Sequence, residues 1–305
     1  MIEAMAVGIL VGSVHSGTPL LYATLSEVVS ERGGIVNLGL EGVMLMGAVV
    51  AFAVTAHTGN AAVGVAAAAL AGGIFNLGFG FLVISRRANQ LAGGLAMMFC
   101  GVGLSALIGV SYVGSKIKGL DEIRIPFLSD LPVMGPMLFN YDLLVYAAAP
   151  AALLVWRLLF STRWGLSLRA VGENPTAAFA AGKNPYLLQY QALFLAGMLG
   201  GIAGAHLSVG LAKTWQEWMT AGRGFIAVAL VIFSKWHPLR ALFGSLLFGG
   251  AIALQLQMQA FGVPISPFIL DMLPYLLSLG VLALWGGGRR LAAPGSLGRV
   301  FQGTE

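Results

Sequence analysis

STRWGLSLRAVGENPTAAFAAGKNP, residues 161–185, is a polar and basic interruption between two long apolar segments, and it contains a short helix with both ends marked. Asn174 is a good N-cap, Pro175 stands at the first helical position, and Gly182 is placed to end the helix in a left-handed turn. The TAAFAA between them gives about two turns, and a helix that short is not stable alone in water. It must dock, either on membrane-side neighbours in its own chain or on a soluble partner.

The composition places the flanking apolar segments in a membrane. The chain has 305 residues, 58% of them hydrophobic and 10% charged, with a mean hydropathy of +0.86, whereas a soluble protein carries about 25% charged residues. The candidate spans are 4–25, 37–56, 61–84, 91–113, 142–160, 188–212, 239–256 and 268–285, with a shorter stretch at 224–235. Since a span needs about 20 residues, we predict an all-α polytopic membrane helix bundle of about nine (8–10) segments, some short or broken, forming a single transmembrane domain over residues 1–305.

The basic residues predict which loops face the cytoplasm. Twelve of the seventeen lysines and arginines fall in the loops 26–36, 85–90, 157–187, 235–240 and 286–305. By the positive-inside rule these loops are cytoplasmic, including the segment 161–187 and the tail 286–305. The long loop 114–141 is then extracytoplasmic, and with nine spans the N-terminus lies outside. The start, MIEAMAVGIL, lacks the basic region of a cleaved signal peptide, so we expect the first segment to be retained.

A second unusual stretch is ERGGIVNLGLEGVMLMGA, residues 31–48, in which five glycines interrupt an apolar run. Asn37 and Glu41 are four apart, so a helix would place them on one face. A carboxylate inside a membrane costs about 3 kcal/mol and usually faces a cavity or a partner. We therefore consider two interpretations. Either both residues face a substrate path or hold a broken helix that lines it, or Glu41 lies near the cytoplasmic interface and pairs with Arg32.

A third stretch is AGRGFIAVALVIFSKWHPLRALFGSLLFGG, residues 221–250. From Phe225 the apolar residues run about ten positions to Lys235, which is too short for an ordinary span, so the segment is re-entrant or packed inside the bundle. Phe225 is a further candidate for a substrate path. The Trp236-His237-Pro238 that follows makes a turn, because proline stops the helix.

Signatures of enzymes and metal sites are missing from the sequence. There is no phosphate loop, no HExxH and no GxSxG, so no catalytic residue is assigned. The four histidines are scattered, and the single cysteine, Cys100, can form neither an intrachain disulfide nor a metal cluster. If ATP drives this protein, another subunit must bind it. The scattered basic residues do not suggest nucleic acid.

The three stretches together resemble the transmembrane permease subunits of bacterial ABC importers for branched-chain amino acids, ribose-type sugars and nucleosides. ERGGIVNLGLEGVMLMGA resembles an early signature of that family and is closest to its nucleoside and simple-sugar branch. LRAVGENPTAAFAAG resembles the cytoplasmic coupling segment, and GRGFIAVALVIFSKWHP a late block. The resemblance covers nearly the whole chain in the family's order.

The resemblance implies a permease subunit in the bacterial plasma membrane, working by alternating access. Its partners would be cytoplasmic ABC ATPases that hold ATP and Mg²⁺, a second and longer permease chain, and an extracytoplasmic binding lipoprotein; this chain would carry no cofactor. The ATPase-coupling role falls on Arg169, Gly172, Glu173, Asn174, Pro175 and Gly182. The implied solute is neutral, a nucleoside first and a ribose-type sugar second. An ATP-independent secondary transporter is the remaining alternative. Such proteins usually show ionisable residues within spans, and these are scarce here, with Glu41 as the main candidate and Asp271 near an external end.

Overall fold

A computed structural model gives the architecture and describes residues 2–124, 126, 139–263, 265–266, 269–270, 272–285 and 293–299. The predicted outer loop 114–141 and the tail 286–305 therefore lie partly outside the described residues, and Asp271 lies outside them.

The described residues are mostly helical. The helices are α1 (Ile2–Arg32), α2 (Leu40–Thr58), α3 (Ala61–Gly80), α4 (Gln90–Gly109), α6 (Leu143–Ser161), α7 (Arg163–Glu173), α8 (Pro175–Ala180), α9 (Pro185–Ala205), α10 (Arg223–Ser234), α11 (Pro238–Ala260) and α13 (Leu273–Trp285). The π-helical turns η1 (Phe81–Ser85) and η3 (His206–Leu211) extend α3 and α9, and the 3-10 turn η2 (Val110–Tyr112) extends α4. Two short strands, β1 (Ile123–Arg124) and β2 (Asn140–Tyr141), pair antiparallel, with Ile123 opposite Tyr141.

The helices confirm the predicted all-α membrane bundle. Six helical segments of the described chain are long and apolar enough to cross a membrane: Leu40–Thr58, Ala61–Ser85, Gln90–Tyr112, Leu143–Ser161, Pro185–Leu211 and Pro238–Ala260. Helix α1 has 31 residues, and the shorter α10 and α13 have 12 and 13. Each of the predicted segments therefore coincides with a helix, and the short stretch at 224–235 is α10.

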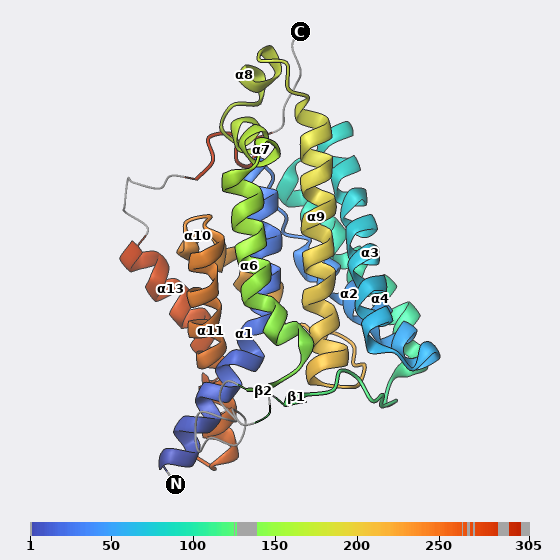
Figure 1. Ribbon diagram of the computed structural model, residues 1–305, viewed down its shortest axis with the longest axis vertical. Coiled ribbons are helices and arrows are strands. Elements are labelled where there is room, and N and C mark those ends of the chain that lie inside the picture. Colours follow the sequence, from blue (N-terminus) through green and yellow to red (C-terminus); the bar gives the residue numbers. More distant parts are fainter. Residues whose placement is uncertain are drawn as a thin grey trace.

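The bundle has two distinct ends (Figure 1). Helices α7 and α8 stand at one end, which we call the α8 end, while the N-terminus and the strands β1 and β2 lie at the opposite end, which we call the N-terminal end. Helix α10 begins part of the way along the bundle: at 1.5 Å per residue it extends only about 18 Å from the turn that joins it to α11. That turn lies at the α8 end, because the carbonyl of Trp236 contacts Arg32 at the end of α1.

Helices α2 and α9 form the centre of the bundle. About two thirds of the most apolar part of α2, and 72% of that of α9, is buried, against 28% for α4 and α6. Small residues let these central helices approach closely. A side chain at Gly204 of α9 would overlap the backbone of Met44 in α2, and one at Gly201 would overlap the carbonyl of Ala68 in α3. The small residues of α9, among them Gly201 and Gly204, thus form packing surfaces.

We predict that Gly201→Ala destabilises the bundle, because its methyl group would displace the α3 backbone, at a cost of about 1–3 kcal/mol. The matched control is Gly103→Ala in α4, where the new methyl group meets nothing within 4 Å. That variant should be neutral or slightly stabilising. Thermal unfolding of the purified protein in detergent separates the two variants, and equal midpoints would contradict the packing described here.

Candidate functional site

The short helix predicted from the sequence is α8, and both of its ends are as expected. The Asn174 side chain accepts a hydrogen bond from the amide of Ala177 at 3.0 Å, and Pro175 occupies the first turn. Gly182 has φ +76°, and its amide donates to the carbonyl of Phe179. Most residues of 173–184 are exposed. The local structure is therefore capped within the chain, while much of the helix surface stays open to another molecule.

Helix α7 connects this exposed helix to the bundle. Arg169 donates from Nε to the carbonyl of Leu159 at 3.0 Å, and its guanidinium lies 4.8 Å from the centre of the Phe160 ring. Gly172 lies against the backbone of Arg32, where any side chain would overlap the Arg32 carbonyl. Arg169 and Gly172 thus hold α7 against α6 and the end of α1, whereas Glu173 and Asn174 are exposed.

Arg32 binds the turn between α10 and α11. Its Nε and Nη2 atoms donate to the carbonyl of Trp236 at 3.1 and 3.0 Å. The predicted alternative, a pair between Arg32 and Glu41, is not formed, because Glu41 has other partners. Burial lowers the pKa of the His237 imidazole in this turn, and the cations of Arg240 and Arg32 lower it further.

A segment of the C-terminal tail closes the same junction. The amide of Ser296 donates to the carbonyl of Gly172 at 2.9 Å, and its hydroxyl donates to the same carbonyl at 2.6 Å. The amide of Gly295 donates to the Glu173 carboxylate at 3.1 Å. The Ser296 hydroxyl also lies against Gly34, which has φ +87° and no room for a side chain. The tail therefore joins the end of α7 to the segment that follows α1.

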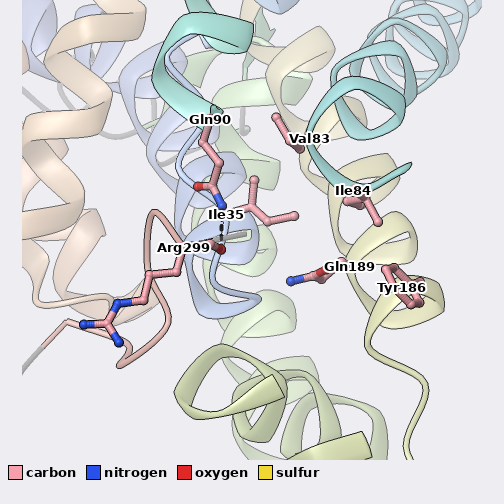
Figure 2. Close-up of a pocket in the computed structure, with 7 residues that line it drawn as sticks. All are labelled: Ile35, Val83, Ile84, Gln90, Tyr186, Gln189 and Arg299. Carbon is pink, nitrogen blue, oxygen red and sulfur yellow. Dashed lines mark hydrogen bonds between the residues drawn. The ribbon is translucent and has the colours of Figure 1, made fainter. Parts of the chain in front are cut away.

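Gln90, at the start of α4, is a second connection to that segment. Its Oε1 accepts from the amide of Val36 at 2.9 Å, and its Nε2 donates to the carbonyl of Arg299 at 3.2 Å. Figure 2 shows Gln90 and Arg299 joined by this bond, with Gln189 of α9 at the side of the same small pocket. The Gln189 amide donates to the carbonyl of Gly33 at 3.0 Å. Side chains from α4 and α9 thus bind backbone groups that no helix satisfies.

Asn37 lies in the irregular segment 33–39 between α1 and α2, so it is not on one helix face with Glu41. Its amide nitrogen donates to Glu27 at 2.7 Å, and its side chain donates to Asn76 at 2.8 Å. Asn76 in turn donates to the carbonyl of Leu193 at 2.7 Å. All three polar side chains are buried. Asn37 therefore holds the break between α1 and α2 against α3 and α9.

Glu41 caps helix α10. The amides of Gly222 and Gly224 donate to its two carboxylate oxygens at 2.8 and 2.6 Å, and the Thr220 hydroxyl donates to the first of them. The positive end of the helix dipole favours a carboxylate at this position. Gly222 has φ +78°, and Gly224 has no space for a side chain because Glu41 lies against it. The Gly222-Arg223-Gly224 sequence is thus explained by a contact with residue 41.

The candidate residues fall into two groups. The coupling candidates, from Arg169 to Gly182, lie together on and beside α7 and α8. The contact of Gly172 with Arg32 connects them to the break between α1 and α2, which contains Asn37 and is followed by Glu41. Phe225 is separate, because its side chain is 37% exposed on the outer side of α10. The roles of Asn37, Glu41 and Phe225 in a substrate path stay predictions.

Several buried polar residues escaped the sequence analysis. Glu27, Glu31, Asn76, Gln90 and Gln189 each bind backbone or side chains of another segment. Glu27, Glu31 and Gln90 lie in the predicted loops 26–36 and 85–90, whereas Asn76 and Gln189 are polar residues inside predicted spans. That signal was available, but it does not identify the partner. Within the described ranges, no group of three or more His, Cys, Asp or Glu side chains is arranged to hold a metal ion.

Comparison with known proteins shows similarity along the whole bundle. The family described as the permease component of branched-chain amino acid transport systems matches residues 9–282. The putative glucose ABC transporter permease protein TsgC13 of Haloferax volcanii is 36% identical, over 96% of this chain and 97% of the relative. No solved structure matches the chain.

Two further relatives carry nucleoside names. The nucleoside ABC transporter permease protein NupC of Lactococcus lactis is 35% identical, over 88% of this chain and 89% of the relative. The guanosine ABC transporter permease protein NupQ of Bacillus subtilis is 34% identical, over 90% of each chain.

The Glu41 contacts predict the effect of Glu41→Gln. The amide keeps the shape of the carboxylate but places an NH₂ group against an N–H or O–H donor, so at least one buried donor loses its acceptor, at about 1–3 kcal/mol. We expect a lower unfolding temperature and slower transport, with the protein still inserted. The matched control is Glu217→Gln, an exposed glutamate in the same loop as Thr220. Wild-type stability and transport in Glu41→Gln would contradict the cap.

Proposed function

This chain belongs to the family of permease components of branched-chain amino acid transport systems, and we propose that it carries a nucleoside across the membrane within an ABC importer. The nucleoside is supported by the relatives named for nucleoside and for guanosine transport. A simple sugar is the second candidate, favoured by the relative named as a putative glucose permease. The chain is a multi-pass membrane protein and a transport subunit.

The proposed partner at the α8 end is a cytoplasmic ATPase that binds ATP and Mg²⁺. Its support is the geometry of α8, a capped helix of six residues that is mostly exposed. A helix that short is unstable alone in water, and here it is fixed by its caps and by α7. The same end gathers basic residues of several loops, among them Arg32, Arg86, Arg163, Lys183 and Lys235. This distribution favours a cytoplasmic α8 end and an external N-terminus.

The observation that carries the mechanism is the direct backbone contact of Gly172 with Arg32. A displacement of α8 moves α7, and α7 pushes on the end of α1 and on the irregular segment 33–39. That segment leads into α2, where Glu41 holds the start of α10. The ATPase thus shifts the bundle between two discrete arrangements, one open to each side of the membrane. This chain supplies no chemistry of its own.

Completion of the importer requires a second permease subunit, which we propose to be a related, longer chain, and an extracytoplasmic binding lipoprotein. The binding protein would dock at the N-terminal end of the bundle, where β1 and β2 lie (Figure 1). All subunits would sit in or on the bacterial plasma membrane.

Uptake of labelled nucleosides tests the solute. Cells with and without this gene are compared, and excess unlabelled ribose is added to the parent strain as a competitor. We expect deletion to abolish nucleoside uptake and ribose to leave the parent's uptake unchanged. Persistent nucleoside uptake in a deletion strain that lacks other nucleoside carriers would overturn the nucleoside assignment in favour of a sugar.

Loss of the α8 cap should uncouple ATP hydrolysis from transport. Asn174→Ala removes the side-chain acceptor for the Ala177 amide, which costs a helix about 1 kcal/mol, and Pro175→Gly loosens the first turn. We expect both variants to insert normally and to lower uptake per ATP hydrolysed in the reconstituted importer.

The matched control is Asn60→Ala. Asn60 caps α3 through the amides of Ala62 and Val63, but it lies at the N-terminal end of the bundle. The Asn60→Ala variant therefore loses an equivalent helix cap, but at a position away from the proposed ATPase contact. Equal coupling in Asn174→Ala and Asn60→Ala would contradict the role of α8.

A further inference from the structure

Arg223 is a partly buried charged residue that lies part of the way along the bundle. It is the first residue of α10, so it lies about 18 Å from the turn at the α8 end, measured along the helix. A cation at such a depth costs about 3 kcal/mol or more, and arginines found there face a cavity or a polar partner. The amides of Gly222 and Gly224 at the start of α10 already donate to the Glu41 carboxylate. The donors that could still bind another molecule at this position are those of the Arg223 guanidinium.

The hydrogen bonds of this guanidinium are incomplete. Its Nη1 donates to the carbonyls of Thr220 at 3.1 Å and Met219 at 3.4 Å. Its Nε is buried and finds no acceptor within the part of the chain that the structure describes. A buried donor without an acceptor is uncommon in proteins and asks for an unseen ligand or water.

Two cavities meet at Arg223, each of about 310 Å³. One lies between α10, α11 and α13 and is lined by Ile226, Ile252 and Gln255 among others. The second is lined by the end of α9 and the loop that follows it, including Thr214 and Gln216. That volume is at the lower limit of small-molecule sites. Besides Arg223, the described residues that line the two cavities carry amides, hydroxyls or apolar groups, and none of these described residues is a carboxylate.

We propose that Arg223 binds the solute during transport, donating hydrogen bonds to an oxygen acceptor of a neutral molecule that passes between the two cavities. This inference rests on the proposed function and names the residue that recognises the solute. Arginine has only donors, so it selects for acceptors. In a nucleoside we assign the acceptor either to a carbonyl of the base or to the 2′- or 3′-hydroxyl oxygen of the ribose, and the aliphatic Ile226 and Ile252 offer a surface for the flat ring.

The test measures maximal uptake rates in cells that hold the complete importer. Labelled inosine is compared with purine riboside, which lacks the base carbonyl, and with 2′,3′-dideoxyinosine, which lacks two ribose hydroxyls. Saturating concentrations keep the affinity of the binding protein from limiting the rate. Arg223→Met removes the donors and keeps an unbranched, apolar side chain, while Arg240→Met is the control, since Arg240 is an exposed arginine at the start of α11.

We expect Arg223→Met to slow inosine uptake about tenfold or more, as for a lost hydrogen bond to a charged group. One analogue should be carried equally well by the parent and the variant, and its identity tells whether the base carbonyl or the ribose supplies the acceptor. Arg240→Met should leave all three rates unchanged. If Arg223→Met does not insert, Arg223→Lys serves in its place, with a smaller loss for inosine.

Three results would count against the proposal or its premise. Equal slowing of all three solutes by Arg223→Met would assign Arg223 a structural role, and unchanged rates would remove it from the path; either result overturns the proposal while leaving the nucleoside function intact. Uptake of none of the three by the parent strain would overturn the nucleoside function itself, before any variant is compared, and this inference with it.

Discussion

The carboxylate of Glu41 at the start of α10 is the interaction on which the interior of this bundle depends. Helix α10 begins part of the way along the bundle, and a half-length helix of this kind is stabilised when a neighbour supplies acceptors for its first amides. Glu41 supplies them with both oxygens. The same hydrogen bonds offset the cost of burying the carboxylate. Its oxygens gain donors, and the amides gain the acceptors that they would otherwise lack. Residues 41 and 220–224, far apart in the chain, therefore specify one structure together.

A second set of contacts connects this interior to the α8 end. The irregular segment 33–39 exposes backbone groups that a continuous helix would satisfy, and these are bound by Gln90, Gln189 and Glu27 from three different helices. Gly172 and Ser296 lie against the same segment from α7 and the tail. The break is thus held from several sides, which suits an element that must adopt a small number of defined arrangements instead of bending continuously.

The sequence was sufficient for the elements and insufficient for their partners. Hydropathy located each predicted span, and local capping rules located α8, because both depend on residues that are neighbours in the chain. The short apolar run before Lys235 also indicated a partial span. In contrast, the sequence suggests Arg32, nine positions away, as a partner of Glu41, whereas the partners of Glu41 lie about 180 positions away. The four-residue spacing predicts Asn37 on one helix face with Glu41, because the glycines around Asn37 indicate a break without fixing its boundaries. Contacts of this range depend on how the helices pack, which a single sequence does not state.

The tail segment 293–299 has a consequence for how the protein is made. It is synthesised after every helix that it joins, so α7 and the segment 33–39 are inserted before Ser296 exists to bind them. During that interval the carbonyl of Gly172 lacks the two hydrogen bonds that it later accepts from Ser296. A ribosome-bound or shortened chain would therefore contain its membrane helices but lack the hydrogen bonds between Ser296 and Gly172 at the α8 end. The carbonyl of Gly172 therefore receives these hydrogen bonds only after the rest of the subunit has been synthesised.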